Sequence, residues 1–172
     1  MAQHRYLVGA NALFSPSGRI NRLQFALNFW MFQIIYLLIL LGVDMLPDAV
    51  SDELMSKLDQ PVTWLTMVLT VLLYYAMFCL MAMRLHDIGL TAWLALVLFA
   101  GIAPNLIGVF GGPALAANED LMINLSNLST LGNLAVLIAG LLLTFWPGMA
   151  GANPYGQSPN EITLPSCEIS DR

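Results

Sequence analysis

The chain has 172 residues, of which 58% are hydrophobic and 10% charged, with a formal net charge of −5 and a mean hydropathy of +0.73. Soluble domains carry roughly 25% charged residues, so this chain has too little charge to cover the surface of a soluble globule. The composition excludes an ordinary soluble domain and indicates a membrane protein of one domain.

A polar segment precedes the first apolar stretch. It carries Arg5, Arg19 and Arg22, the last two three residues apart, so they would share one face of a helix. The apolar stretch begins only at Leu23 and has no convincing small-residue cleavage site after it, so we interpret it as a retained anchor rather than a cleaved signal. We expect residues 1–22 to form a cytoplasmic N-terminal segment.

The expected membrane domain, residues 23–147, contains four uncharged apolar stretches. Each has about the 20 residues that a helix rising 1.5 Å per residue needs to cross a hydrocarbon core about 30 Å thick. A helix satisfies its own backbone hydrogen bonds, which lipid cannot do for it. The pattern predicts an all-α fold, a bundle of four transmembrane helices over residues 23–43, 61–83, 90–110 and 128–146.

The third stretch is interrupted by Pro104 and Asn105. Proline removes one backbone hydrogen bond and kinks a helix, and we favour an ordinary kink here. The alternative is a polar path lined by Asn105 with Asn28 and Gln33 of the first stretch, as in transporters with broken helices. No ionisable side chain lies in the middle of a span, which argues against a proton-coupled pump.

The positive residues predict the orientation. With the N-terminus inside, Lys57 is the one positive residue outside, and the acidic residues of the loops after the first and third stretches also lie outside. The positive-inside rule therefore favours cytoplasmic N- and C-termini, with residues 148–172 as a cytoplasmic loop and tail. The positive residues that this orientation places inside are Arg5, Arg19, Arg22, Arg84 and Arg172.

The junction of the second and third stretches, "MAMRLHDIGLTAW", places three ionisable residues together: Arg84, His86 and Asp87. If the second helix continues through this junction, Arg84 and Asp87 share one of its faces, and Gly89 stops the helix.

These charges suggest an ion-pair network at the membrane boundary. We expect Asp87 to pair with Arg84 and with Arg19 or Arg22, and His86 to hydrogen-bond a loop carbonyl. Two alternatives remain for the same residues: a catalytic acid–base pair, and a site for anionic lipid headgroups.

The segment after the fourth stretch, "FWPGMAGANPYGQSP", combines glycine and proline with one tyrosine, which indicates a shaped loop. We expect Asn153 and Tyr155 to cap the bundle by hydrogen bonds to the arginines or to the junction of the second and third helices. A nucleotide-phosphate loop is rejected, because no lysine follows the glycines.

Three motifs follow one another on the expected cytoplasmic side. They are Gly-Arg-Ile-Asn-Arg before the first span, Arg-Leu-His-Asp-Ile-Gly between the second and third, and Pro-Gly-x-x-Gly-x-Asn-x-Tyr-Gly after the last. In this order they resemble the domain-of-unknown-function 805 family over Leu13 to Pro159. Leu90 and Pro154 stand where that family usually has basic residues. The resemblance implies a small bacterial inner-membrane protein and supplies no activity.

These observations favour an integral inner-membrane protein with a structural or regulatory role and a cytoplasmic interaction face. The alternatives are a small oligomeric transporter or channel subunit and an enzyme that acts on lipid headgroups; an enzyme is less favoured. The residues expected at the interaction face are Arg19, Arg22, Arg84, His86, Asp87, Asn153 and Tyr155.

The expected partners are membrane lipids with anionic headgroups, and a partner protein or further copies of the chain; nucleic acid is not expected. Two cysteines and two histidines without close spacing predict no metal site, and no cofactor is expected.

Overall fold

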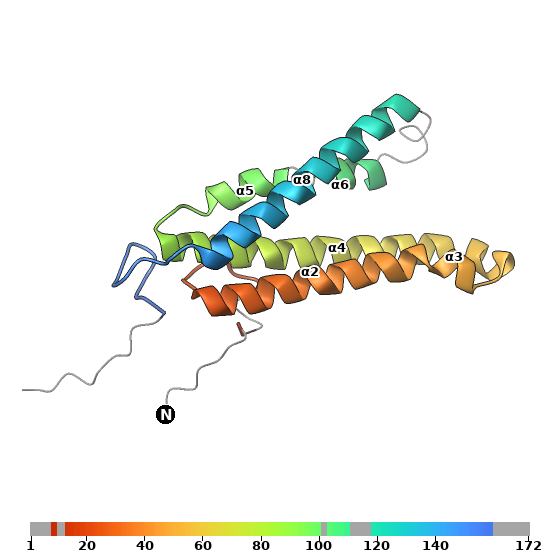
Figure 1. The fold of residues 1–172 in the computed structure, drawn as a ribbon. Helices are drawn as coiled ribbons and strands as arrows, with labels where there is room; N and C mark the ends of the chain where they lie inside the picture. Colours follow the sequence, from red (N-terminus) through yellow and green to blue (C-terminus); the bar gives the residue numbers. More distant parts are fainter. Residues whose placement is uncertain (1–7, 10–12, 101–102, 111–117, 160–172) are drawn as a thin grey trace, which may run out of the picture.

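The computed structural model describes residues 8–9, 13–100, 103–110 and 118–159, and most of these residues are helical (Figure 1). The prediction of an all-α fold is confirmed for them. Three helices are long, namely α2 (Arg22–Asp44), α4 (Asp52–Ile88) and α8 (Glu119–Phe145), and three are short, namely α3 (Leu46–Ala49), α5 (Trp93–Ala100) and α6 (Ala103–Phe110).

The long helices meet closely at one end of the molecule. α2 and α4 lie side by side, and α8 packs on both of them near its C-terminal end (Figure 1). Towards its own N-terminus α8 diverges from the pair, and α6 packs against it there. The diverging end is the one that carries α3, and we call it the α3 end.

The first long helix begins where the sequence suggests. Asn21 caps α2: its side-chain oxygen accepts from the backbone N–H of Gln24 at 2.8 Å, and the Gln24 side chain accepts from the backbone N–H of Asn21 at 3.2 Å. This reciprocal pair satisfies two backbone donors at the start of the helix.

The second helix is longer than predicted. α4 begins at Asp52 rather than Pro61, because Asp52 and Glu53 in its first turn interact favourably with the positive end of the helix dipole. It also continues past Met83 to Ile88. The prediction that Gly89 stops it is confirmed: this residue has φ 88° and donates its N–H to the carbonyl of His86.

In the third stretch the structure describes two helical segments, α5 and α6, of eight residues each, and the two residues between them lie outside the described ranges. Each rises about 12 Å, too little to cross a bilayer alone. Pro104 lies in the first turn of α6, where its missing N–H breaks no helical hydrogen bond. The fourth stretch, in contrast, begins earlier than predicted, because Asn118 caps α8.

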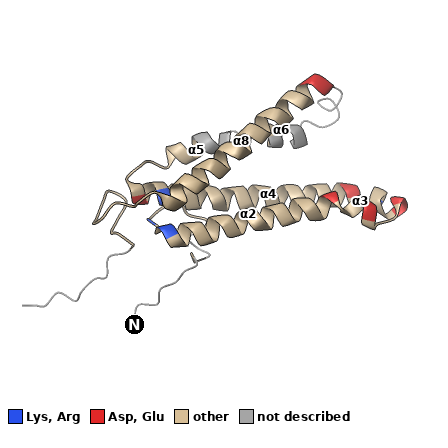
Figure 2. Cartoon of the chain, viewed as in Figure 1, with Lys and Arg blue, Asp and Glu red and all other residues tan. Residues whose placement is uncertain are grey.

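Three helices are long and apolar enough to cross a membrane: α2, α4 and α8, with 23, 37 and 27 residues. Their outer faces expose leucines such as Leu38, Leu65 and Leu131, which suits contact with lipid chains. Charged residues lie at the two ends of the bundle (Figure 2). The protein is therefore a multi-pass membrane protein.

The core lies at the end opposite α3. Phe25 and Phe29 of α2 are fully buried and stack with ring centroids 5.1 Å apart. A Cβ atom on Gly140 of α8 would collide with the Phe29 ring, so a glycine is needed where α8 meets α2. Beside this contact the Trp30 ring donates to the hydroxyl of Thr144 at 3.2 Å. The close packing of α2 on α8 fixes the end of the bundle that holds the candidate site.

Candidate functional site

A buried cluster of three charges lies where α2 begins and α4 and α8 end. Arg19 donates from Nε and Nη2 to Oδ1 of Asp87, at 3.1 and 3.0 Å, and Arg84 donates to Oδ2. The side chains of Arg19, Arg84 and Asp87 are 1%, 0% and 4% exposed. We call these three residues the arginine–aspartate cluster; each carboxylate oxygen has its own arginine.

Arg19 also ties the C-terminal loop to the cluster. Its Nη1 donates to the carbonyls of Gly151 and Gly156, at 2.8 and 3.0 Å, and its Nη2 to the carbonyl of Met149 at 2.7 Å. One guanidinium therefore holds both a carboxylate and three points of the loop after α8. Arginine suits this role because its planar fork presents five donors in fixed directions.

Arg84 does the same for the end of α8. It donates to the carbonyls of Leu143, at 3.0 Å, and Trp146, and to that of Ile20 ahead of α2, at 3.4 Å. The last carbonyls of a helix lack helical partners and carry its negative dipole charge. They help to compensate the second positive charge, since the cluster has two arginines and only one carboxylate.

A second set of contacts lies beside the cluster. His86 Nδ1 is 3.2 Å from the carbonyl oxygen of Gly18, so this nitrogen carries the hydrogen and donates it. The His86 ring stacks on Tyr155, with centroids 3.9 Å apart and planes 8° apart. Asn153 donates to the carbonyl of His86 at 2.8 Å and accepts from the backbone N–H of Tyr155 at 2.9 Å. The loop thereby covers the end of α4.

Glycine at position 148 allows this close approach. A Cβ atom there would collide with Oδ2 of Asp87 and lie 3.3 Å from Nη1 of Arg84. The next residue, Met149, donates its N–H to the carbonyl of Asp87 at 2.8 Å. The backbone of the loop thus lies directly against the cluster.

Arg22 is the predicted residue that lies apart. It is the first residue of α2 and is exposed, and no described residue forms a hydrogen bond or ion pair with it. Of the two partners considered for Asp87 besides Arg84, the structure selects Arg19. The structure therefore joins six of the seven predicted residues through direct contacts.

A family model described as "Protein of unknown function (DUF805)" matches residues 13–157 of the 172. The chain belongs to this family. The match includes the whole arginine–aspartate cluster and the loop that covers it, and it confirms the resemblance seen in the three motifs. A search of the curated proteins and a search of the solved structures found no match. The DUF805 family description supplies no activity.

The DUF805 cluster is closely bonded on all sides. Both oxygens of Asp87 accept from arginines, and its side chain is 4% exposed, so the carboxylate is engaged in two buried ion pairs. Arg19 and Arg84 donate to backbone carbonyls as well, and a phosphate would have to displace those bonds. Within the described ranges no group of three His, Cys, Asp or Glu side chains is placed to hold a metal ion.

Sequence reasoning missed a second polar feature of this DUF805 chain, a cavity near the α3 end. It is lined by hydroxyl and amide groups that recur three or four residues apart, a spacing that places each set on one face of its helix. The described lining does not include Asn28 or Gln33, and the side chain of Asn105 lies outside the described residues. The polar residues lining the cavity are Tyr36, Thr63, Thr66, Thr70, Ser126, Ser129, Thr130 and Asn133.

Proposed function

We propose that this DUF805 chain is a bacterial inner-membrane protein with a structural or regulatory role, whose cytoplasmic end presents a fixed surface to a partner protein. The observation that carries the proposal is the arginine–aspartate cluster. Asp87 joins two arginines that reach the segment before α2 and the loop after α8. Such bonding gives a surface one shape and leaves little capacity for chemistry.

The distribution of charge supports this orientation. At the end of the bundle that holds the cluster, the described cations are Arg19, Arg22 and Arg84. The α3 end has Lys57 together with seven acidic residues. An excess of arginine and lysine on one side marks the cytoplasmic side of a bacterial inner-membrane protein.

Helices α5 and α6 together form the fourth crossing in this proposal. α4 and α8 both end at the cluster. α8 therefore begins at the opposite side of the bundle from the end of α4. The chain between them must return across the membrane. α5 packs on α4 and α8, and α6 packs on α8, which places the two short helices along that route (Figure 1).

The proposed interaction face consists of the loop after α8 and its surroundings. Pro154 and Gln157 are exposed on the loop, and Arg22 is exposed at the start of α2, where it can approach anionic headgroups. Trp93 and Trp146 are exposed nearby, as expected for aromatic anchors at a membrane–water boundary.

Photo-crosslinking in living cells tests the proposed function. A photoreactive amino acid replaces Gln157 on the loop or, as a control, Ser51 at the α3 end; both positions are exposed. We expect one discrete protein adduct from position 157, none of the same size from position 51, and loss of the adduct when Asp87→Asn loosens the loop. Equal adducts from both positions, or none from position 157, would contradict the proposal.

A second candidate function, a carrier or channel subunit, is favoured by the polar cavity at the α3 end. In such a protein the arginine–aspartate cluster would be the closed gate on the other side, and transport would require its bonds to break. Uptake by proteoliposomes that rises in Asp87→Asn relative to the unaltered chain would support this candidate.

A further inference from the structure

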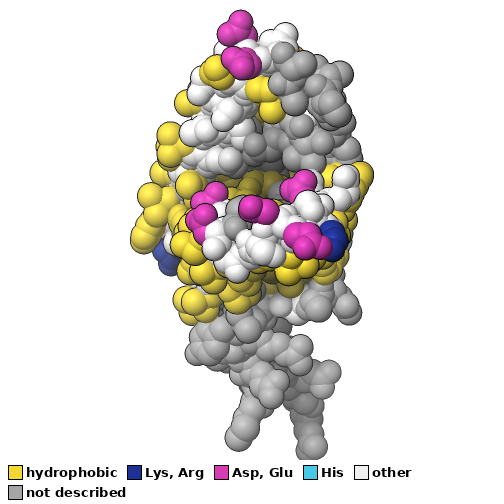
Figure 3. Space-filling model, turned by 90° about the vertical axis from the view of Figure 1, so that its right-hand side faces the viewer, with side chains coloured by type: hydrophobic (Ala, Val, Ile, Leu, Met, Phe, Trp, Pro, Cys, Tyr) yellow, Lys and Arg dark blue, Asp and Glu magenta, His cyan; other side chains and the backbone are white. Residues whose placement is uncertain are grey.

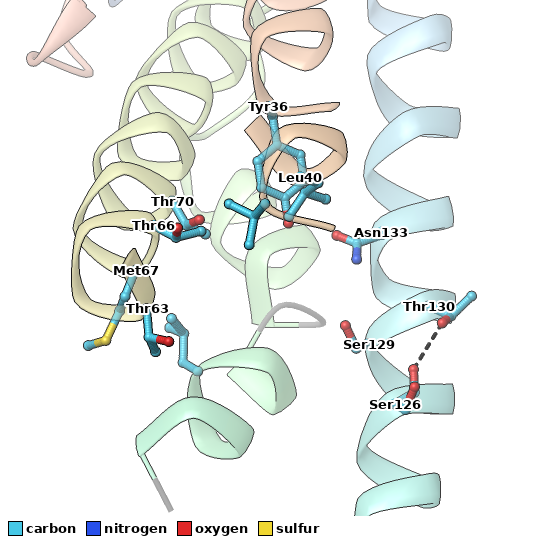
Figure 4. A pocket seen from close by; sticks show the side chains of 12 residues that line it. Tyr36, Leu40, Thr63, Thr66, Met67, Thr70, Ser126, Ser129, Thr130 and Asn133 are labelled. Atoms are coloured by element: carbon cyan, nitrogen blue, oxygen red, sulfur yellow. Dashed lines mark hydrogen bonds between the residues drawn. The ribbon is translucent and has the colours of Figure 1, made fainter. Parts of the chain in front are cut away.

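The cavity lies between helices, in the half of the bundle that is remote from the arginine–aspartate cluster (Figure 4). α2, α4, α6 and α8 all contribute to it, and its volume is about 540 Å³. Sites for small molecules usually measure about 300–1,000 Å³. The divergence of α8 from α2 and α4 creates this space, which is large enough for a ligand.

Two polar stripes face one another across the cavity. Thr63, Thr66 and Thr70 follow one face of α4, and Ser129 and Asn133 project from α8 on the opposite side (Figure 4). Thr66 donates to the carbonyl of Val62 at 2.8 Å, and a hydroxyl bonded to its own helix in this way still has lone pairs that can accept a bond from a ligand. The convergence of these polar groups on one space makes that space suitable for a polar ligand.

The hydrogen-bonding capacity of these groups is only partly used within the described residues. Ser129 is 5% exposed, and no described residue hydrogen-bonds its hydroxyl. Tyr74 donates to Oδ1 of Asn133 at a long 3.5 Å, and no described group accepts from the amide nitrogen of Asn133. No buried side-chain polar atom of the described residues lacks a partner, so the spare capacity of Ser129 and Asn133 is accessible from the cavity, where a ligand or water can use it.

The charges around the cavity indicate which charge a bound ligand can carry. None of the described residues that line it is charged. Figure 3 looks onto the α3 end and shows acidic side chains there, which repel anions. A cation would enter a space with no carboxylate in its lining, so an uncharged molecule fits best. Leu40, Val43, Met67 and Leu106 in the lining provide apolar contact.

We propose that this cavity binds an uncharged molecule with a partly apolar body and hydroxyl, ether or carbonyl groups, reached from the α3 side of the membrane. Ser129 and Asn133 bond its polar groups from α8, opposite the threonines of α4. The inference goes beyond the proposed function, because the cavity is remote from the cytoplasmic face. Two sources carry this chemistry: a neutral lipid in the bilayer and a solute from the aqueous side.

Photolabelling of the purified full-length chain in nanodiscs tests the proposal. The probe is a monoacylglycerol with a diazirine in its chain, and labelled peptides are identified by mass spectrometry. We expect labels around residues 63–70 and 126–133. A lysophosphatidic acid with the same chain, whose head is anionic, should label these segments at least about tenfold less. Competition by the water-soluble hexyl glucoside distinguishes the sources: if it prevents labelling, the aqueous route is open, and if not, the ligand enters from lipid.

Three variants distinguish a specific binding site from an apolar space that binds the probe non-specifically. Ser129→Leu fills the cavity and should abolish labelling. Thr70→Val keeps the volume but removes one hydroxyl, and should weaken binding of the probe roughly twofold to tenfold, the usual worth of one hydrogen bond. Ala135→Leu adds the same kind of bulk on an exposed face of α8 and should change nothing.

Three results would overturn the proposal. One is unchanged labelling in both Ser129→Leu and Thr70→Val; if Ser129→Leu fails to fold, Thr70→Val decides alone. Another is equal labelling by the neutral and the anionic probe. The third is a change in oligomeric state on Ser129→Leu, measured by size-exclusion chromatography with light scattering, since a second copy of the chain would then be what covers the cavity.

Discussion

The imidazole of His86 lies parallel to the ring of Tyr155, 3.9 Å away between centroids. His86 belongs to the last turn of α4 and Tyr155 to the loop after α8, so the stack joins segments that are far apart in the chain. Asn153 bonds the carbonyl of the same histidine. The loop is therefore held at two points on one residue, besides its bonds to Arg19.

The stack predicts the behaviour of Tyr155 variants. Tyr155→Leu should lower the free energy of unfolding by about 1 kcal/mol, the usual value of an aromatic pair. Tyr155→Phe keeps the ring and should change it little. Thermal unfolding in detergent, followed by tryptophan fluorescence, provides the measurement. If the phenylalanine variant loses as much stability as the leucine variant, the hydroxyl rather than the stack secures the loop.

Removing the carboxylate of Asp87 should be the most damaging change at this end of the molecule. Asp87→Asn leaves two buried arginines without their counter-ion, and breaking a buried pair costs roughly 3–5 kcal/mol. Asp87→Ala should cost more, because the alanine also accepts no hydrogen bonds. His86→Ala should cost less than either. The melting temperature in detergent ranks the variants.

Lys57→Gln is the control for Asp87→Asn, because it leaves the acidic first turn of α4 unchanged. It breaks the ion pair between Lys57 and Glu53, whose side chains are 67% and 84% exposed. Water replaces such a pair at little cost, so the melting temperature should not move. Equal losses in the two variants would show that burial does not strengthen the cluster.

The sequence predicts the composition of this cluster well. Arg84 and Asp87 three residues apart on one helix, with Gly89 after them, suffice to predict an ion pair at a helix end. Arg19 and Arg22 were indistinguishable by spacing. Which of the two pairs with Asp87 depends on the loop after α8, because the carbonyls of Met149, Gly151 and Gly156 accept hydrogen bonds from Arg19.

The cavity and the helix limits were harder to predict for physical reasons. Hydropathy marks where a helix crosses lipid, not where it ends, so the polar turns of α4 from Asp52 to Pro61 were missed. The threonines and serines of α4 and α8 do not lower hydropathy enough to interrupt a span. Only the divergence of α8, a tertiary property, shows that Thr63 and Ser129 face a common space.

Gly148 should not tolerate a side chain. In Gly148→Ala the new methyl group would overlap the carboxylate of Asp87, and either the loop or the ion pair must move. We expect a loss of about 1–3 kcal/mol, as for other overpacked sites. Gly42→Ala is the control: nothing lies within 4 Å of its added Cβ, and alanine favours the helix by about 0.5–1 kcal/mol. Melting temperatures should thus shift in opposite directions.

The contact between Gly140 and Phe29 should show coupling in a double-mutant cycle. Gly140→Ala drives a methyl group into the Phe29 ring, and Phe29→Leu opens a space there. Each single variant should lose stability, and the pair should lose at least about 1 kcal/mol less than the sum, since contacting residues are not additive. Additive losses in chemical denaturation would show that α8 and α2 are not in direct contact at this position.

The proposed orientation predicts the activity of reporters fused along the chain. Green fluorescent protein, which matures in the cytoplasm, should fluoresce at both the N- and the C-terminus. Alkaline phosphatase, which needs the oxidising periplasm to form its disulfides, should be active when fused after Ser51, at the α3 end. The arginines at one end and the acidic residues at the other carry this expectation.

An active phosphatase at the C-terminus would mean that α5 and α6 do not provide a crossing or that the whole bundle is inverted. The fusion after Ser51 separates these cases, because it reports only the crossing by α2. Activity of this fusion would mean that the orientation is right and that α5 and α6 do not cross. Inactivity would mean that the whole bundle is inverted.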